Sequence, residues 1–152
     1  MIDVEKEILK KFPNLEKNSS ALKKSLLKIA KKIVHEDTIN QFICEHSHLK
    51  GFEFIDAVLD YFDFDYTVSS NDIENIPSTG KVIIIANHPL GGLDALCLLK
   101  LVGQIRKDVK IIANDFLAGF DALKSLFIPI DNFKSKQAKN DIKTIYEALN
   151  KA

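Results

Sequence analysis

The hydrophobic pattern divides the chain into a helical first part and a second part in which strands and helices alternate. Over residues 1–65, apolar side chains recur at helical spacing, which predicts helices at 2–12, 20–34, 37–46 and 52–62. A short strand is predicted at 66–68 and a turn at 75–80. Further strands are predicted at 82–86, 109–113 and 126–130, and further helices at 93–105, 116–124 and 135–149.

This order of elements indicates an α/β fold. The β-branched run from Val82 to Ala86 is continuous, as is typical of a strand buried on both faces. Strands that alternate with helices form a layered sheet, so we expect N-terminal helices followed by an alternating β-α sheet. The helical portion is 1–65 and the α/β portion is 66–152. Without a convincing linker between them, we treat the two as one structural unit.

Composition narrows the class of protein. The chain has 152 residues, is 46% hydrophobic and carries no net charge, which argues against disorder. Its two cysteines, Cys44 and Cys97, are too few for a disulfide scaffold, and no apolar stretch approaches the ~18 residues that a membrane span requires. We therefore expect a soluble or peripheral globular protein from a reducing compartment.

The zero net charge conceals a basic, amphipathic N-terminal helix. Residues 1–34 carry nine lysines against four acidic residues. In the predicted helix 20–34, lysines alternate with apolar residues at helical spacing, namely Lys24, Lys28 and Lys31 among Leu22, Leu26, Ile29 and Ile33. Such a helix can lie in a membrane interface, so these lysines are predicted membrane contacts. The alternative is a surface helix whose apolar stripe packs on the core.

The candidate chemistry follows the apolar run 82–86. His88 stands where that predicted strand ends, and ligands of open α/β sheets bind outside the carboxyl ends of the strands. Asp94 lies in the first turn of the next predicted helix, where the helix dipole favours a carboxylate. Gly91 and Gly92 permit a close approach of the backbone to a ligand.

An imidazole and a carboxylate so placed predict an acid–base dyad. Asp94 would hold one ring nitrogen of His88 and leave the other free to take a proton from a hydroxyl. No Ser or Cys nucleophile lies beside them in the sequence, because Cys97 is expected to be a small buried hydrophobic residue. This favours direct attack by an acceptor hydroxyl. A structural histidine, and a packing turn or phosphate cradle at the two glycines, remain alternatives.

The segment 87–94 resembles the first motif of the glycerolipid (lysophospholipid) acyltransferase superfamily, in its hemolysin-like or ornithine-lipid acyltransferase branch. Its sequence is Asn87-His88-Pro89-Leu90-Gly91-Gly92-Leu93-Asp94. The resemblance covers roughly residues 50–135, including 73–77, 106–114 and 126–131. It implies that His88 is the general base and Asp94 its partner. It also implies an acyl donor that is a thioester of CoA or acyl carrier protein, and a lysolipid acceptor.

The chain departs from the family pattern at three points. Five residues separate His88 from Asp94 where the family usually has four, although the branch it resembles shares the longer spacing. The second motif, 127–131, lacks the usual Arg that helps bind the acceptor's phosphate, which argues against a glycerol-3-phosphate type of acceptor. The third motif, Phe-Pro-Glu-Gly, is absent, so we expect an incomplete sheet: either a piece of a longer enzyme, inactive alone, or a relic without catalysis.

These features predict a lipid O-acyltransferase, peripheral to the inner face of the cytoplasmic membrane, without a cofactor, a metal or a nucleic-acid partner. The predicted substrate-binding residues are Asn87, Gly91, Gly92 and Asn114. Asn114 follows a predicted strand and could equally cap the next helix.

A metal site at the Cys44–His48 segment is a weaker alternative, because no second ligand cluster matches it. The alternative functions are a non-catalytic membrane-binding or lipid-binding module and a thioester or lipid hydrolase.

Overall fold

The structure of the chain, a computed structural model, describes residues 3–11, 21–87, 89, 91–114, 120–130 and 138–151. These residues form two compact units, one within 1–48 and the other within 49–152. The boundary expected at residue 65 therefore falls inside the second unit. The reason is that the helix over 52–61 packs against a helix of the α/β portion.

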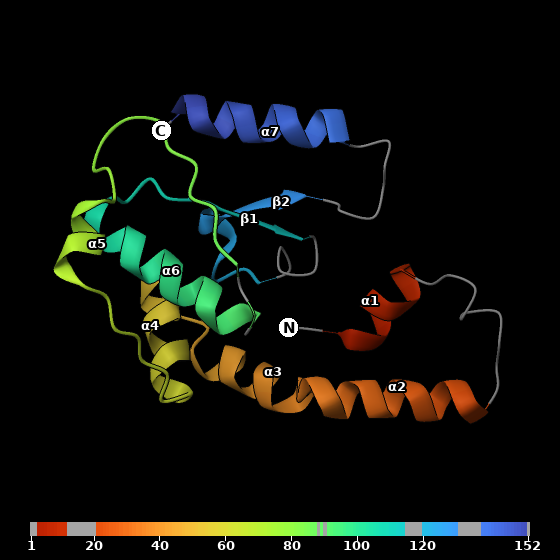
Figure 1. Ribbon diagram of the computed structural model, residues 1–152. Coiled ribbons are helices and arrows are strands. Elements are labelled where there is room, and N and C mark those ends of the chain that lie inside the picture. Colours follow the sequence, from red (N-terminus) through yellow and green to blue (C-terminus); the bar gives the residue numbers. More distant parts are fainter. Residues whose placement is uncertain are drawn as a thin grey trace. The chain divides into compact units, whose positions relative to one another are not determined.

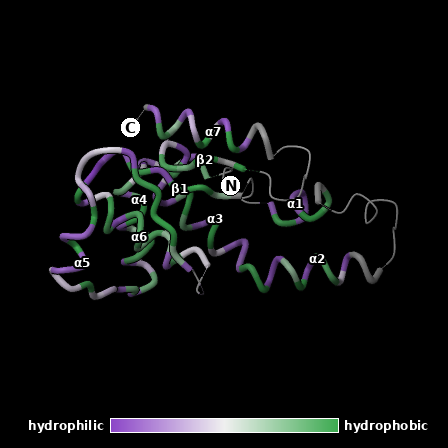
Figure 2. The backbone as a smooth tube through the Cα atoms, turned by 45° about the horizontal axis from the view of Figure 1, so that its top comes forward, coloured by the Kyte–Doolittle hydropathy of each residue, from purple (hydrophilic) through white to green (hydrophobic). Residues whose placement is uncertain are grey.

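The first unit contains the helices α1 (Val4–Lys11), α2 (Ala21–Val34) and α3 (Glu36–Glu45), as the sequence predicts (Figure 1). Helix α1 packs on α2, and Val4 and Leu27 are buried. The backbone N–H of Val4 donates to Glu36 Oε2 at 2.9 Å, which satisfies a donor that the start of a helix leaves unpaired. Hydrophobic and hydrophilic residues alternate along α2 (Figure 2).

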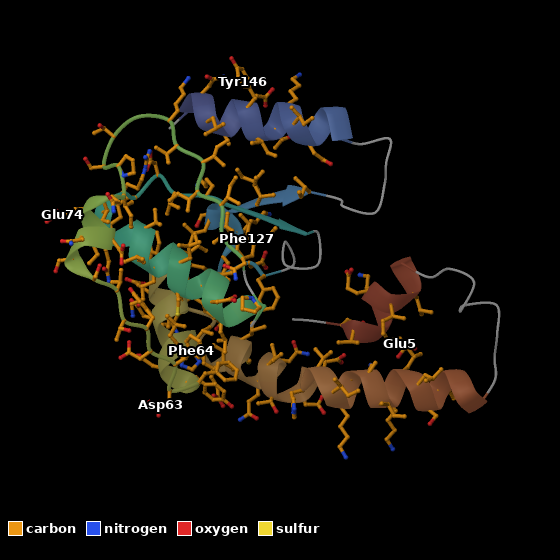
Figure 3. The ribbon with its side chains drawn as sticks, in the orientation of Figure 1. Glu5, Asp63, Phe64, Glu74, Phe127 and Tyr146 are labelled. Carbon is orange, nitrogen blue, oxygen red and sulfur yellow. The ribbon has the colours of Figure 1, made fainter. Side chains whose placement is uncertain are left out.

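Four helices of the second unit are α4 (Phe52–Tyr61), α5 (Ser70–Glu74), α6 (Gly92–Ile105) and α7 (Ala138–Lys151). The sequence predicts α4, α6 and α7 but misses α5. The sequence feature that could have indicated α5 is its N-cap residue, Ser69, whose Oγ accepts a hydrogen bond from the backbone N–H of Asp72 at 3.2 Å. Helix α7 contacts strand β2 (Phe127–Ile130), and Tyr146 lies on the side of α7 away from it (Figure 3).

Strands β1 (Ile111–Asn114) and β2 form a parallel pair, as expected for an α/β fold. Their register pairs Ile111 with Phe127 at one end and Asn114 with Ile130 at the other. A short 3₁₀ helix, η3 (Lys124–Leu126), leads into β2. The helix predicted at 116–124 lies partly outside the described residues. Its described part is not an α-helix, because residues 121–123 form a turn and Lys124 begins η3.

Two predicted strands are wrong. Residues 66–68 and 82–86 belong to no strand, and Ile85 is 90% exposed where burial on both faces was expected. A β-branched run becomes a strand only where a neighbour pairs with its backbone N–H and C=O groups. Within the described ranges, neither segment has such a neighbour. Among the residues that the structure describes, the expected alternating β-α sheet consists of the β1–β2 pair.

The core of the second unit lies between α4 and α6. Helix α4 buries Phe54, Ile55 and Leu59, and α6 buries Cys97, Leu99 and Val102. Gly103 brings the helices close together, because a Cβ atom built on it would lie 2.2 Å from Cε1 of Phe52. Lys100 Nζ adds an ion pair with Asp56 Oδ1 at 2.7 Å. These contacts fix the helix that begins at the candidate site.

Candidate active site

Asp94 occupies the first turn of α6, as the sequence predicts. Gly91 caps the helix with φ 73° and ψ −112°, a conformation that residues with a Cβ atom rarely adopt. The half-buried Asp94 accepts a hydrogen bond at Oδ1 from the backbone N–H of Ala95, at 2.8 Å. The bond holds the side chain in the first turn of the helix, beside the positive end of the helix dipole.

The backbone at Gly91 and Gly92 is open. A Cβ atom built on either glycine would meet no other part of the described chain within 4 Å. Close packing therefore does not explain why glycine stands at these two positions, which weakens the interpretation as a packing turn. The start of α6 instead presents backbone N–H groups that intrahelical hydrogen bonding leaves unpaired. Such groups can receive an anion or a carbonyl oxygen.

The topology places the predicted substrate-binding residues toward one end of the second unit. Helix α6 joins β1 through the short segment 106–110 and runs in the opposite direction to it, so the start of α6 lies toward the carboxyl end of β1 (Figure 1). Asn114 is the last residue of β1 and is in register with Ile130 of the parallel strand β2. Asn87 is exposed on the segment that leads to α6. His88 lies outside the described residues, so its separation from Asp94 stays a prediction.

Cys97, one turn beyond Asp94, fits the role of a buried hydrophobe. Burial raises the pKa of its thiol, Lys100 acts against this, and the charge of Asp94 raises it further. A thiol whose pKa is raised carries less thiolate, the form that attacks carbonyl carbons. Cys97 is therefore a poor nucleophile, in keeping with the predicted direct attack.

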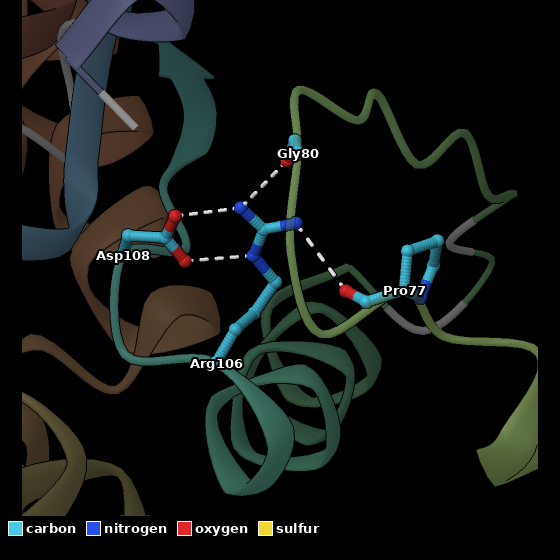
Figure 4. A network of polar contacts seen from close by, with 4 residues as sticks. All are labelled: Pro77, Gly80, Arg106 and Asp108. Carbon is cyan, nitrogen blue, oxygen red and sulfur yellow. Dashed lines mark hydrogen bonds and ion pairs between the residues drawn. The ribbon is translucent and has the colours of Figure 1, made fainter.

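Arg106 holds together the loop that precedes the site, a role that the sequence did not reveal. Its guanidinium group donates to both carboxylate oxygens of Asp108, at 2.7 and 2.6 Å (Figure 4). It also donates to the carbonyl oxygens of Gly80, at 3.0 Å, and Pro77, at 3.3 Å. The hydrogen bonds with Arg106 lower the pKa of Asp108. Arg106 thereby links the end of α6 to the loop from which residues 82–87 continue toward the site.

The predicted membrane lysines all lie on α2, in the first unit. Lys24 and Lys28 are exposed. Lys31 differs, because its Nζ lies 3.5 Å from both Glu5 Oε2 and Glu36 Oε1. Glu5 sits between α1 and α2 in Figure 3. The structure therefore engages Lys31 in ion pairs within its own unit.

The segment Cys44–His48 forms a polar helix end. His46 Nδ1 makes a 3.0 Å hydrogen bond with the carbonyl oxygen of Phe42, and the two rings stack at 4.2 Å. Among the residues that the structure describes, no group of three or more His, Cys, Asp or Glu side chains could hold a metal. In the same residues, no helix is both long and apolar enough to cross a membrane.

The described residues thus hold a parallel strand pair and the helix α6, which begins at the glycine pair and carries Asp94 in its first turn. The chain belongs to the acyltransferase family, whose model matches residues 8–149. This match confirms the predicted superfamily.

Two curated relatives carry a more specific name. The chain is 36% identical over 141 residues to a lyso-glycine lipid O-acyltransferase of Bacteroides thetaiotaomicron, and 31% identical over 149 residues to one of Phocaeicola vulgatus. These alignments cover 92% and 97% of the chain but 50% and 51% of the relatives. The chain thus spans about half the length of the curated relatives it matches. No solved structure matches it at a significant level.

Proposed function

We propose that this chain carries the acyl-transfer site of a lipid O-acyltransferase, which moves a fatty acyl group from a thioester to the hydroxyl of a lysolipid. The observation that carries the proposal is the position of Asp94, hydrogen-bonded in the first turn of α6 and two residues after an open glycine pair. Membership of the acyltransferase family and the names of the two relatives support the same reaction.

His88 acts as the general base in this proposal. One ring nitrogen takes the proton of the acceptor hydroxyl while that oxygen attacks the carbonyl carbon of the thioester, and Asp94 stabilises the resulting imidazolium. The tetrahedral intermediate then collapses, the C–S bond breaks, and the departing thiolate takes the proton from His88. The products are an ester and a free thiol. Backbone N–H groups near Gly91 and Gly92 are suited to stabilise the oxyanion.

The acceptor that we propose is a lysolipid with a glycine head group, by analogy with the two relatives. The sequence supports a head group without a phosphate, because the second motif, 127–131, carries no basic residue. Strand β2 in particular consists of Phe-Ile-Pro-Ile. An acceptor recognised through a phosphate would need a cation there, which Arg supplies best.

The donor that we propose is a thioester of CoA or acyl carrier protein. The chemistry requires neither a cofactor nor a metal, because the imidazole and carboxylate together provide the proton transfer. Such donors are cytoplasmic molecules, whereas the acceptor is a lipid, so the reaction is placed at the inner face of the cytoplasmic membrane.

Thioester consumption in the protein that carries this chain, measured with and without lyso-glycine lipid, tests the proposal. Loss of donor only when the acceptor is present supports transfer. Loss of donor at the same rate without acceptor would make the protein a hydrolase. The absence of any loss would leave a non-catalytic lipid-binding module.

Variants of the dyad test the assigned roles. We expect His88→Ala to lower kcat by about 10²–10⁴-fold, the usual contribution of a general base, and Asp94→Asn to lower it by a smaller factor. Glu74→Gln is the matched control, because Glu74 is an exposed carboxylate on α5, near the opposite end of α6 (Figure 3). Full activity in His88→Ala would refute the dyad.

A further inference from the structure

Helix α2 carries an apolar ridge, made of Leu26, Ile29 and Ile33, that no described side chain covers. These side chains are 64%, 51% and 71% exposed. Their spacing of three and four residues places them on one face of the helix. Scattered exposed apolar residues are ordinary, but three contiguous ones on one face mark an interaction surface.

The opposite face of α2 is already occupied within the first unit. Leu27 is buried, and Lys31 pairs with Glu5 of α1 and Glu36 of α3. With 3.6 residues per turn, the centre of the apolar ridge lies ~150° around the helix axis from the side that carries Leu27 and Lys31. Helix α1 therefore packs on the back of the helix and cannot cover the ridge.

The lysines of α2 are not equivalent with respect to the ridge. By the same geometry, Lys28 and Lys32 lie ~90–130° from its centre, whereas Lys24 and Lys31 lie ~170° from it. Lys28 and Lys32 are exposed, and the helix contains no acidic residue. Long lysine side chains beside an apolar face can extend toward charged groups while their stems cover apolar surface. The ridge thus has a basic margin, formed by Lys28 and Lys32.

We propose that α2 docks on an anionic lipid surface through this ridge, with Lys28 and Lys32 at the head-group level and Lys24 and Lys31 facing away. An apolar ridge with a basic margin and no acidic residue is complementary to anionic lipid head groups above acyl chains. This surface differs from the sequence-based prediction, which grouped Lys24 and Lys31 with Lys28. The inference does not depend on the proposed reaction, since it concerns the first unit alone.

Tryptophan fluorescence tests the orientation, because the chain contains no Trp. In the full chain, Ile29→Trp places a single reporter on the ridge, and Lys24→Trp places a matched reporter on the opposite face. With phosphatidylcholine vesicles that contain phosphatidylglycerol, we expect a blue shift of the emission for Ile29→Trp and none for Lys24→Trp. Equal shifts at both positions, or a shift at Lys24→Trp alone, would overturn the proposed orientation.

Vesicle pelleting tests the forces. We expect Ile29→Ser with Ile33→Ser to weaken binding by about tenfold or more, because both side chains lose apolar burial. At an ionic strength of ~0.1 M, where the Debye length is ~10 Å, Lys32→Gln should weaken binding about fivefold, as expected for one basic residue near the surface. Lys24→Gln should change binding less than twofold, because a helix diameter of ~10 Å puts it about one Debye length farther away. Circular dichroism verifies that each variant keeps its helices.

Three outcomes would contradict the proposal: no binding of the unmodified chain to anionic vesicles, binding unaffected by salt, and equal losses for Lys24→Gln and Lys32→Gln. Self-association that Ile29→Ser with Ile33→Ser abolishes, without any vesicle binding, would assign the ridge to a second copy of the chain instead. The vesicle experiments contain no acyl donor, so a failure to bind vesicles would not bear on the proposed reaction. Conversely, a lack of acyl transfer would not bear on vesicle binding.

Discussion

Helices α2 and α6 have the same length, fourteen residues, but their apolar side chains lie in opposite environments. Helix α6 packs on α4, and Leu99 and Val102 are each 2% exposed. Helix α2 packs on α1 through one face and exposes a second apolar face. The amphipathic pattern therefore predicts that a segment is helical, whereas the partner elements decide which of its apolar faces becomes core. The covered helix can position chemistry, and the uncovered one is available to a surface.

The largest difference in stability should come from replacing one isoleucine by alanine in each of the two regions. Ile55 of α4 is fully buried, so Ile55→Ala should lower the free energy of unfolding by about 2–5 kcal/mol. Ile29→Ala on the exposed ridge of α2 should change it by less than about 0.5 kcal/mol. Denaturant unfolding followed by circular dichroism measures both values. Equal losses would mean that the ridge is buried in solution, and the contrast between the two regions would disappear.

A glycine substitution tests how closely α4 and α6 approach each other. In an exposed helix, Gly→Ala stabilises by roughly 1 kcal/mol. Gly103→Ala should instead destabilise by about 1–3 kcal/mol, because the new Cβ atom would lie 2.2 Å from the ring of Phe52. Combining it with Phe52→Leu should recover part of the loss, since the smaller side chain makes room. If Gly103→Ala stabilises the protein, the two helices are not in close contact.

The open end of α6 should respond differently from its packed end. Gly91→Ala should cost of order 1–3 kcal/mol, because φ 73° with ψ −112° is strained for a residue with a Cβ atom. Gly92→Ala should leave stability unchanged or slightly raised, since its Cβ atom would meet nothing among the described residues. If substrate approaches this backbone, Gly92→Ala should still lower kcat/KM severalfold. Unchanged acyl transfer in Gly92→Ala would remove Gly92 from the substrate-binding residues.

The same contrast explains which features the sequence could predict. Periodicity predicts α2 and α6 nearly as they stand, and it places Asp94 in the first turn of α6. It fails at 82–86, because a strand depends on a pairing neighbour that the run itself does not specify. It also fails at Lys31, because an ion pair with Glu5 joins residues far apart in the chain. Arg106 was missed for the same reason, since its hydrogen bonds to the carbonyl oxygens of Pro77 and Gly80 also join residues far apart in the chain.

The smallest expected effects concern the pH dependence of stability, which should differ between the two units. The hydrogen bonds with Arg106 lower the pKa of Asp108 below its ordinary value of 3.8, so this ion pair stabilises the second unit above that pH. The contribution is lost as the pH falls through the lowered pKa. For Lys31, burial lowers the pKa, but the carboxylates of Glu36 and Glu5 raise it more, to a net value above 10.5. Its contribution to the first unit is present below 10.5 and is lost as the pH rises through the raised pKa.

Substitution of Asp108 should therefore remove a pH dependence of stability on the acid side, and substitution of Lys31 should remove one on the alkaline side. Asp108→Asn should flatten the acid side of the thermal-unfolding profile and leave the alkaline side unchanged. Lys31→Gln should flatten the alkaline side and leave the acid side unchanged. Both shifts should be small, because each ion pair has a solvent-exposed partner, and such pairs contribute little and weaken further with salt. If both variants alter the same side of the profile, the two ion pairs do not act independently, and the separation of the chain into two differently stabilised units is wrong.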